Sequence, residues 1–457
     1  MSIAAAIKSL QGKFGDKVTQ NTAILEQHGQ NEAYFPVTPP DAVVFPESTQ
    51  DVSEIVKICA EHHCPVIAYG TGTSLEGHQL AIKGGISLDM SKMNAVLVVH
   101  AEDMDAVVQP GVTREQLNED LRATGLFFPV DPGANASLGG MAATRASGTT
   151  AVRYGTMREN VMALEVVLAD GRIIRTGSRA RKSSAGYDLT KLFVGSEGTL
   201  GIITEITLRL QGQPEAVSAA TCSFPDIESA VNTVMTTIQM GIPMARIEFV
   251  DEMMVKGFNL YQGSEMPEVP HLFVEFHGSP NGVREQAESF GEIVADMGGS
   301  DFEWSDSTED RNALWKMRHN AYYAHKALRP DAHALSTDVC VPISRLAEAV
   351  NFARAESGRL DLMVSILGHV GDGNFHCAVS FDPDDPAEHA AVKEFLHNLN
   401  KHALELDGTV TGEHGVGVGK MKYMADEHGE ALQVMAGLKK TLDPLNIMNP
   451  GKILPVN

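Results

Sequence analysis

Residues 65–77 read PVIAYGTGTSLEG, an apolar run that leads directly into a loop of glycine and hydroxyl residues. The run 65–69 predicts a buried strand. Glycines let backbone N–H groups approach a phosphate closely, and hydroxyl groups add donors. The loop 70–77 has neither the Gly-Lys-Ser/Thr of a Walker A motif nor the G-x-G-x-x-G spacing of a Rossmann turn. Taken alone, it fits a phosphate-binding loop and an ordinary tight turn equally well.

Two more stretches of small residues follow in the first half of the chain. Residues 131–148 read DPGANASLGGMAATRASG, with RYG just beyond at 153–155, and residues 195–201 read GSEGTLG. Small residues over such lengths are expected neither to pack a core nor to form a stable helix, and they suit a backbone that lies flat against a ligand. Three such segments predict a large cofactor that has both phosphates and a flat ring.

The composition bounds the class of protein. The 457 residues carry 36 basic against 59 acidic side chains, a formal net charge of −23, which argues against nucleic acid and anionic membranes as main partners. Five scattered cysteines without a CxxC pair argue against an iron–sulfur cluster and suit a reducing compartment. No apolar stretch approaches the length of about 18 residues that spans a bilayer. We expect two or three domains in a cytoplasmic protein, or in one held peripherally at the inner face of a membrane.

Beyond Pro214 the pattern changes to longer helices between strands. Strands are predicted at 218–224, 244–250, 271–277, 362–369 and 375–381, and helices at 226–240, 281–297, 308–327, 344–356, 386–406 and 430–442. Helices interleaved with strands in this way predict one sheet covered by helices. The sequence therefore predicts a domain edge near 214.

Residues 368–376, GHVGDGNFH, are the strongest candidate for a metal site. Asp372-Gly373 is a favoured two-residue type I′ turn, and counting outward from it places His369 directly opposite His376. Opposed residues share one face of a hairpin, with Cβ atoms about 4.5–5.5 Å apart. A lone histidine is more often a hydrogen-bonded core residue, whereas two cross-strand imidazoles favour a pair of metal ligands.

A third ligand is available in residues 411–417, TGEHGVG. Glu413 supplies a carboxylate and His414 a titratable imidazole. Two histidines and one carboxylate leave coordination positions open for a substrate, as in catalytic metal sites. The spacing alone does not tell whether Glu413 comes near His369.

Four motifs together resemble one family of flavoproteins. They are STDVCVP at 336–342, the hairpin at 368–376, TGEHG at 411–415 and NPGK at 449–452. Their combination is similar to the FAD-linked D-2-hydroxy acid dehydrogenases of the vanillyl-alcohol-oxidase/p-cresol-methylhydroxylase superfamily. The chain is most similar to the cytochrome-type D-lactate dehydrogenases, with the flavin subunit of glycolate oxidase and D-2-hydroxyglutarate dehydrogenase as relatives. The likeness runs from about Pro39 to Gly451.

The resemblance implies an α+β fold. It consists of a two-part FAD-binding domain of the vanillyl-alcohol-oxidase/p-cresol-methylhydroxylase type and an α+β cap domain whose sheet is covered by helices. The implied domains are an N-terminal helical segment at 1–35, the FAD-binding domain at 36–213, the cap with the metal site at 214–430, and a C-terminal segment at 431–457 that returns to the FAD domain. The first loop ends Glu76-Gly77-His78, without the Arg-Ser-Gly-Gly-His context of covalent relatives, so non-covalent FAD is expected. Whether His78 modifies the FAD environment is left open.

The resemblance also assigns the FAD contacts. The loop 70–77 would hold the pyrophosphate, 131–148 and 195–203 would follow the isoalloxazine and adenine ends, and Asn449 would reach the flavin. The residues assigned in this way are Gly70, Thr71, Gly72, Thr73, Ser74, Leu75, Gly77, Pro132, Gly133, Ser137, Gly139, Gly140, Ala143, Ser147, Gly148, Tyr154, Gly155, Glu197, Gly198, Gly201, Ile203 and Asn449.

The implied chemistry is oxidation of a 2-hydroxy acid. His369, His376 and Glu413 would bind a divalent metal (Zn, Mn or Fe), which the hydroxyl and carboxylate of the substrate chelate. His414 would take the hydroxyl proton as general base while a hydride passes from the substrate Cα to flavin N5. Arg318 would clamp the carboxylate. Without the resemblance, Arg318 reads as a surface salt-bridge residue.

The substrate and the electron acceptor are less sharply defined. In 2-hydroxyglutarate relatives a lysine aligns with Ser336, and its absence, together with Tyr322 and Tyr323, favours D-lactate oxidised to pyruvate; glycolate and D-2-hydroxyglutarate are the alternatives. The acceptor would be cytochrome c, a quinone or an electron-transfer flavoprotein. Two other functional classes remain as alternative hypotheses: a two-domain metallohydrolase with a nucleotide-binding loop, and a non-catalytic nucleotide- or metal-binding module. The sequence leaves the oligomeric state undetermined.

Overall fold

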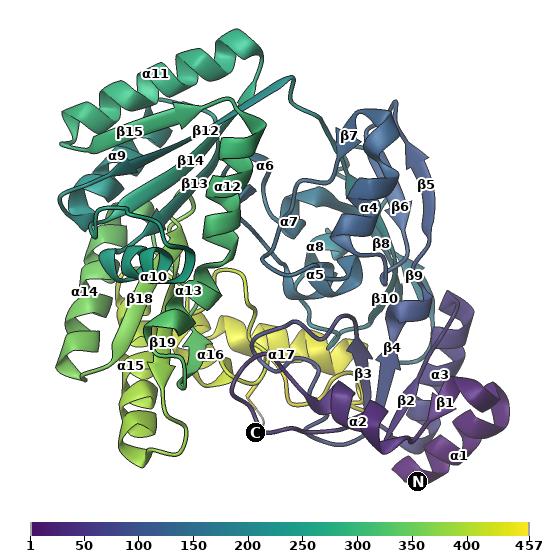
Figure 1. Cartoon of the computed structure of the whole chain (residues 1–457). Coiled ribbons are helices and arrows are strands. Elements are labelled where there is room, and N and C mark those ends of the chain that lie inside the picture. Colours follow the sequence, from purple (N-terminus) through teal and green to yellow (C-terminus); the bar gives the residue numbers. More distant parts are fainter. Residues whose placement is uncertain (1, 456–457) are drawn as a thin grey trace. The chain divides into compact units, whose positions relative to one another are not determined.

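The computed structural model describes residues 2–455, and they form two compact units (Figure 1). Unit 1 consists of the residues up to Ser147, Gly155–Gln213, and the residues from Glu413 onward. Unit 2 consists of Gly148–Tyr154 and Pro214–Gly412. This division differs from the predicted domains at 413–430, which belong to unit 1, and at 148–154, which join unit 2. Helix α6 (Ala151–Tyr154) in the latter segment packs on strand β13 (Met244–Val250) of unit 2.

Unit 1 contains a four-stranded sheet in the order β1-β2-β4-β3, in which β2, β4 and β3 are parallel and β1 is antiparallel. Its strands are β1 Val18–Thr19, β2 Ala42–Val44, β3 Val66–Tyr69 and β4 Ile86–Asp89. Beyond β3 the C-terminal segment continues the sheet, because Val66 forms a parallel bridge with Met448. The loop 70–77 begins directly after β3, as predicted.

A second sheet of unit 1 is antiparallel, in the order β5-β6-β10-β8-β9. Its strands are β5 Val96–His100, β6 Asp105–Val108, β8 Val161–Val167, β9 Ile173–Arg175 and β10 Ile202–Arg209; β7 Leu126–Phe127 and β11 Gln211–Gly212 pair separately. The helices of this unit are α1 Ile3–Phe14, α2 Thr22–Gly29, α3 Thr49–His62, α4 Arg114–Asp120, α5 Leu138–Thr144, α7 Met157–Asn160, α8 Leu189–Phe193, α16 Met424–His428 and α17 Ala431–Leu442.

Helix α5 shows that one expectation was wrong. The stretch 131–148 was expected to form neither a helix nor part of a core, yet Leu138–Thr144 is helical and Leu138 and Met141 are fully buried. Gly139 explains the difference, because a Cβ there would lie 2.5 Å from the Cβ of Pro110. The small residues of α5 therefore allow this helix to approach the neighbouring loop at Pro110 closely.

Unit 2 is built on one antiparallel sheet in the order β15-β12-β14-β13-β18-β19-β16, with β17 also paired to β19. Its strands are β12 Ala216–Ser223, β13 Met244–Val250, β14 His271–Gly278, β15 Ser300–Ser305, β16 His333–Ser336, β17 Val339–Cys340, β18 Met363–His369 and β19 Asn374–Phe381. Its helices are α6 Ala151–Tyr154, α9 Ile227–Gln239, α10 Glu252–Gln262, α11 Pro280–Asp296, α12 Thr308–His319, α13 Ala321–Leu328, α14 Leu346–Arg359 and α15 Pro386–Glu405.

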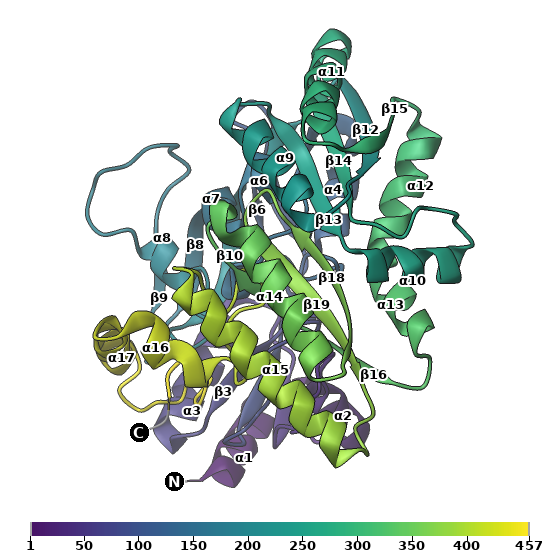
Figure 2. The same ribbon diagram turned by 90° about the vertical axis from the view of Figure 1, so that its left-hand side faces the viewer.

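The two faces of this sheet are covered differently. Helices α9, α11, α14 and α15 pack on one face over a large apolar core that includes Ile247 and Phe249 (Figure 2). The opposite face has a smaller apolar cluster with α10, α12 and α13, which includes Val250 and Trp315. Because side chains alternate along a strand, Arg246 and Glu248 of β13 share this second face with Val250. Polar groups therefore line part of an otherwise apolar layer.

The prediction of a single helix at 308–327 was wrong, because the structure has two helices there. The chain breaks at Asn320, which ends α12 and begins α13, and its backbone N–H bonds back to the last turn of α12. Asparagine competes with helical hydrogen bonding and so favours such an end. Tyr322 and Tyr323 consequently lie on α13 rather than on the helix of Arg318, and both are more than half exposed.

Candidate functional site

The hairpin β18–β19 has a different register from the predicted one. His369 pairs with Asn374, and His376 pairs with Leu367, so the direct His369–His376 pairing was wrong by two residues. Asp372 does not adopt the left-handed conformation that a type I′ turn requires, and only Gly373 does, with φ of 78°. A shift of two residues leaves every side chain on its predicted face, so the two imidazoles still share a face.

The two imidazoles lie close together and are both buried. Their ring centroids are 5.4 Å apart with an interplanar angle of 82°. The Nδ1 of His369 lies 2.7 Å from Oε1 of Glu248, and the Nδ1 of His376 lies 2.8 Å from the backbone oxygen of Thr337. In both cases Nδ1 is the donor, because the partner can only accept, which leaves the lone pair on Nε2. Metal-binding histidines are fixed in this way.

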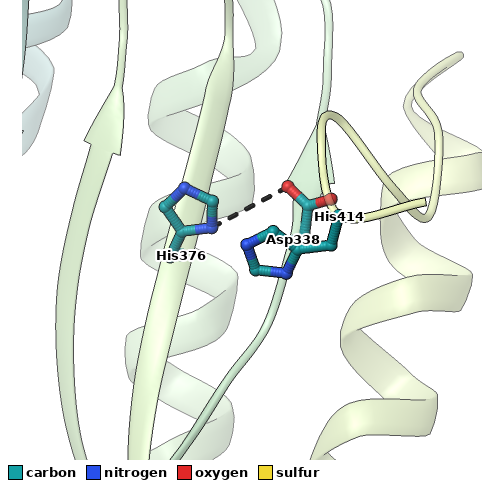
Figure 3. Close-up of side chains that lie close together, drawn as sticks. All are labelled: Asp338, His376 and His414. Carbon is teal, nitrogen blue, oxygen red and sulfur yellow. Dashed lines mark ion pairs between the residues drawn. The ribbon is translucent and has the colours of Figure 1, made fainter. Parts of the chain in front are cut away.

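A fully buried carboxylate, Asp338, lies under His376. It accepts hydrogen bonds from Asn374 Nδ2 at 2.9 Å and from Thr411 Oγ1 at 2.7 Å, and its Oδ1 is 3.8 Å from Nδ1 of His376. Figure 3 shows the side chain of His414 beside those of Asp338 and His376. Asp338 thus contacts residues from two other segments of the chain, strand β19 and the loop that contains Thr411.

Two groups of potential metal ligands result. One contains His369, His376 and Glu413, and the other contains Asp338, His376 and His414; the ligand atoms within each group lie within 4.8 Å of one another. Glu413 and His414 directly follow Gly412, the last residue of unit 2. Two imidazoles with committed Nδ1 atoms and one carboxylate fit a divalent metal such as zinc. The predicted ligand set is therefore brought together, although its role stays a prediction.

Arg318 is not a surface residue, so that reading of it was wrong. Its side chain is buried, and its Nε and Nη2 donate to Oε2 of Glu248 at 3.0 and 2.6 Å. Glu248 therefore joins Arg318 to His369. The predicted clamp on a substrate carboxylate would have to use the remaining edge of the guanidinium group.

The glycine-rich segments of unit 1 meet one another. A Cβ on Gly70 would collide with Oγ of Ser137, and the backbone N–H of Gly195 bonds to the oxygen of Ala142 in α5 at 2.9 Å. The Oγ of Ser137 is buried and makes no hydrogen bond within the described part of the chain. An orphaned buried hydroxyl where two glycine-rich segments meet fits a bound cofactor that supplies the missing partner.

The C-terminal tail joins the same region. The Nδ2 of Asn449 donates to the backbone oxygens of Glu197 at 2.8 Å and His78 at 3.1 Å. Lys452 donates to Oδ1 of Asn449 at 3.1 Å, and burial lowers the pKa of Lys452 to about 8. The Nε2 of His78 lies 3.2 Å from Oε1 of Glu197. Residues assigned to the first loop, the third segment and the tail thus lie together.

Other assigned residues have a different setting. Gly148 and Tyr154 belong to unit 2, where the Tyr154 hydroxyl lies 2.7 Å from Nδ1 of His277. A Cβ on Gly201 would lie 2.5 Å from Cγ1 of Val166, and Ile203 is buried in the same core, so packing explains both residue types. Their contacts with FAD stay predictions.

Sequence reasoning missed Glu248 altogether and gave Asp338 no role. Asp338 lay within the quoted motif STDVCVP, but nothing in its spacing pointed to His376. Glu248 had a usable signal, because Arg246 and Glu248 place charges at alternating positions of a strand predicted to be buried. Charged residues in such a strand require partners.

Comparison with known proteins decides the family. Residues 213–453 match the C-terminal domain of FAD-linked oxidases, and residues 40–177 match an FAD-binding domain. The chain belongs to the FAD-linked oxidase family. It is therefore an FAD-dependent oxidoreductase, and the resemblance drawn from the motifs is confirmed.

Relatives of this FAD-linked oxidase cover nearly all of it. It is 52% identical over 458 residues to a probable mitochondrial D-lactate dehydrogenase of Danio rerio, covering 99% of this chain and 92% of the relative. It is 49% identical over 431 residues to the mitochondrial D-lactate dehydrogenase [cytochrome] of Arabidopsis thaliana, covering 94% and 76%. Solved p-cresol methylhydroxylase with bound substrate superposes with a TM-score of 0.80 at 17% identity, covering 98% and 96%. That match confirms the predicted fold class.

Within residues 2–455, no helix combines the length and the apolar character needed to cross a bilayer. The predicted location, cytoplasmic or peripheral at the inner face of a membrane, stays a prediction.

Proposed function

We propose that this FAD-linked oxidase converts a D-2-hydroxy acid into the corresponding 2-oxo acid. The favoured substrate is D-lactate, whose product is pyruvate. The observation that carries the proposal is the pair of buried imidazoles, His369 and His376, whose Nδ1 atoms donate to protein acceptors and which form one group of potential metal ligands with Glu413. The names of the relatives in Danio rerio and Arabidopsis thaliana support D-lactate as the substrate.

Two groups supply chemistry that the side chains lack. When bound, FAD supplies a two-electron acceptor and a divalent metal supplies a Lewis acid. The assigned metal ligands are His369, His376 and Glu413, with Zn, Mn and Fe as candidates. The three glycine-rich segments and Asn449 are assigned to non-covalent FAD.

Two side chains are assigned to proton transfer and to binding of the substrate carboxylate. Oxidation of the hydroxyl-bearing carbon removes two electrons and two protons, and we assign the hydroxyl proton to His414 as general base. We assign the substrate carboxylate to the outer edge of Arg318, since its inner edge donates to Glu248. Together these groups bind, orient and deprotonate the substrate.

The electron acceptor is proposed to be a cytochrome c. A relative named D-lactate dehydrogenase [cytochrome] supports this choice. The formal charge of −23 suits association with a basic protein. A quinone and an electron-transfer flavoprotein are the alternatives.

The test is anaerobic reduction of the bound flavin. D-lactate should bleach the flavin absorbance without added NAD, L-lactate should not, and oxidised cytochrome c should restore it. Glycolate and D-2-hydroxyglutarate, tested in parallel, decide between substrates; the name of a relative in Bacillus subtilis, a glycolate oxidase subunit, makes glycolate the alternative to compare first. A flavin-loaded protein that none of these acids reduces would refute the proposal.

A further inference from the structure

Glu248 is a completely buried carboxylate whose two oxygens bind two different partners. Oε2 accepts from Nε and Nη2 of Arg318 at 3.0 and 2.6 Å. Oε1 lies 2.7 Å from Nδ1 of His369. All three residues belong to unit 2, and they come from β13, α12 and β18. One side chain thus connects the proposed substrate anchor to a proposed metal ligand.

A second buried carboxylate on the neighbouring strand provides a contrast. Glu275 of β14 also lies near an arginine and a histidine: its Oε1 is 2.7 Å from Nε2 of His277 and 3.7 Å from Nε of Arg246. However, Nδ1 of His277 lies 2.7 Å from the hydroxyl of Tyr154. Both nitrogens of His277 are therefore engaged by groups of unit 2, whereas Glu248 engages Nδ1 of a histidine that also belongs to a group of potential metal ligands.

We propose that Glu248 is the positioning residue of the site: it holds His369 in the Nδ1–H form required for metal binding and fixes the edge of Arg318 that faces the substrate. The inference rests on the proposed function and deepens it. Glu248 itself would touch neither metal nor substrate. Its effect on the metal passes through His369, and its effect on the substrate passes through Arg318.

The proposal depends on Glu248 having two acceptor oxygens. In Glu248→Gln the amide keeps one acceptor and gains an NH2 donor of the same size. Arg318 can only donate, so the amide oxygen turns toward it and the NH2 group faces His369. Nδ1 must then accept, and the proton moves to Nε2, the atom that a metal needs. Loss of such a second partner typically weakens metal binding about 10–100-fold.

The decisive experiment is Zn²⁺ titration of FAD-loaded, metal-free protein against a chromophoric chelator. Glu248→Gln should weaken Zn²⁺ binding at least about 10-fold, whereas Glu275→Gln, which removes the other buried carboxylate, should bind Zn²⁺ like the wild type. Unchanged affinity in Glu248→Gln, or an equal loss in both variants, would overturn the proposal. The flavin absorbance of each variant reports that the protein has folded.

The tautomer of His369 in the wild-type protein tests the proposal even if Glu248→Gln fails to fold. Long-range ¹H–¹⁵N spectra of metal-free protein labelled at histidine should show the Nδ1–H tautomer for the resonance that disappears in His369→Gln. An Nε2–H tautomer there would contradict the proposal without any change at Glu248.

Steady-state kinetics separate this inference from the proposed function. With saturating metal, Glu248→Gln should raise the KM for D-lactate more than it lowers kcat, because a neutral amide oxygen holds the guanidinium group of Arg318 less firmly than the carboxylate does. A change in kcat alone would contradict the coupling to Arg318. A wild-type enzyme inert toward all 2-hydroxy acids would refute the proposed function, while the Zn²⁺ titration would still decide the role of Glu248 at the metal.

Discussion

The carboxylate of Glu197 binds the backbone of Gly417, whose N–H lies 2.9 Å from Oε2; the N–H of Val416 lies 2.7 Å from the other oxygen. Glu197 comes from the third glycine-rich segment, and 416–417 directly follow Glu413 and His414. Both glutamate oxygens are occupied by backbone donors. The carboxylate therefore fixes the loop that carries two proposed active-site residues.

Replacing that carboxylate should disturb the loop. Glu197→Gln leaves one acceptor for two N–H groups, and a charge-assisted hydrogen bond contributes about 1.5–3 kcal/mol. We expect kcat/KM for D-lactate to fall at least about 10-fold. Glu205→Gln, which affects only a partly exposed ion pair with Arg175, is the matched control. Equal kinetics in both variants would contradict this role of Glu197.

Removing one imidazole should release the metal. His376→Gln should lower bound metal, measured by elemental analysis after gel filtration, and should abolish flavin bleaching by D-lactate. The FAD content should stay at the wild-type level, because the FAD-binding domain matches 40–177. His428→Gln, on α16, serves as control. Full metal content in His376→Gln would exclude it as a ligand.

His414 should matter for chemistry rather than for binding. General base catalysis contributes about 10²–10⁴-fold, so His414→Gln should slow flavin reduction by that factor in stopped-flow measurements. The variant should keep both FAD and metal, since the proposed ligands are His369, His376 and Glu413. Reduction at the wild-type rate would remove His414 as the base.

Gly373 should be required for stability. Its φ is 78°, and a Cβ would collide with the backbone oxygen of Val341, so Gly373→Ala should destabilise the protein by about 1–3 kcal/mol or more. Gly437 lies inside α17, where an added Cβ would meet no described atom within 4 Å apart from the backbone of its own helix and its chain neighbours, so Gly437→Ala should stabilise the protein by about 0.5–1 kcal/mol. Urea unfolding measures the free energy of unfolding of both variants. If this free energy rose in both variants, or fell in both, the different surroundings inferred for the two glycines would be contradicted.

His325 should make the protein sensitive to acid. Its ring lies between the hydroxyls of Ser365 and Ser380 at 2.7 and 2.8 Å, and burial lowers the pKa of His325 from 6.5 to about 4. Between these pH values the unfolded chain binds more protons than the folded one, so stability is lost as the pH falls from 6.5 toward 4.

A variant without a titratable group isolates this effect. Relative to His325→Gln, the wild type should lose about 2 kcal/mol of unfolding free energy between pH 7 and pH 5. Urea unfolding at the two pH values measures the difference. Parallel pH dependence of wild type and variant would show that the histidine already takes up its proton in the folded state.

The sequence predicted features that local patterns determine. The strand 244–250 and the loop after Tyr69 follow from apolar runs and glycines, which act within a few residues. The register of the 368–376 hairpin was missed because the turn also has a tertiary contact: the backbone oxygen of Gly373 accepts from the N–H of Val341, and linear spacing does not reveal this bond. The break at Asn320 was missed although the preference of asparagine for helix ends is local.

The candidate site divides in the same way. His369, His376 and Glu413 could be selected because ligand chemistry is visible in the residue types. The pairing of Glu248 with His369 and of Thr337 with His376 could not be predicted, because linear spacing does not show which residues of distant segments meet; the charges in the strand 244–250 indicated only that Glu248 needs a partner. The family resemblance added roles for Arg318 and His414 that residue types alone did not provide.

The bridge between Val66 and Met448 determines when the FAD-binding unit can be completed. The backbone of Val66 bonds to Ile447 and Asn449 on either side, so strand β3 keeps an open edge until those residues exist. During synthesis on a ribosome, all strands of unit 2 emerge before this closing segment does. Unit 2 can therefore fold before this segment has emerged, whereas the four-stranded sheet of the FAD-binding unit keeps an open edge at β3 until residues 447–449 have been synthesised.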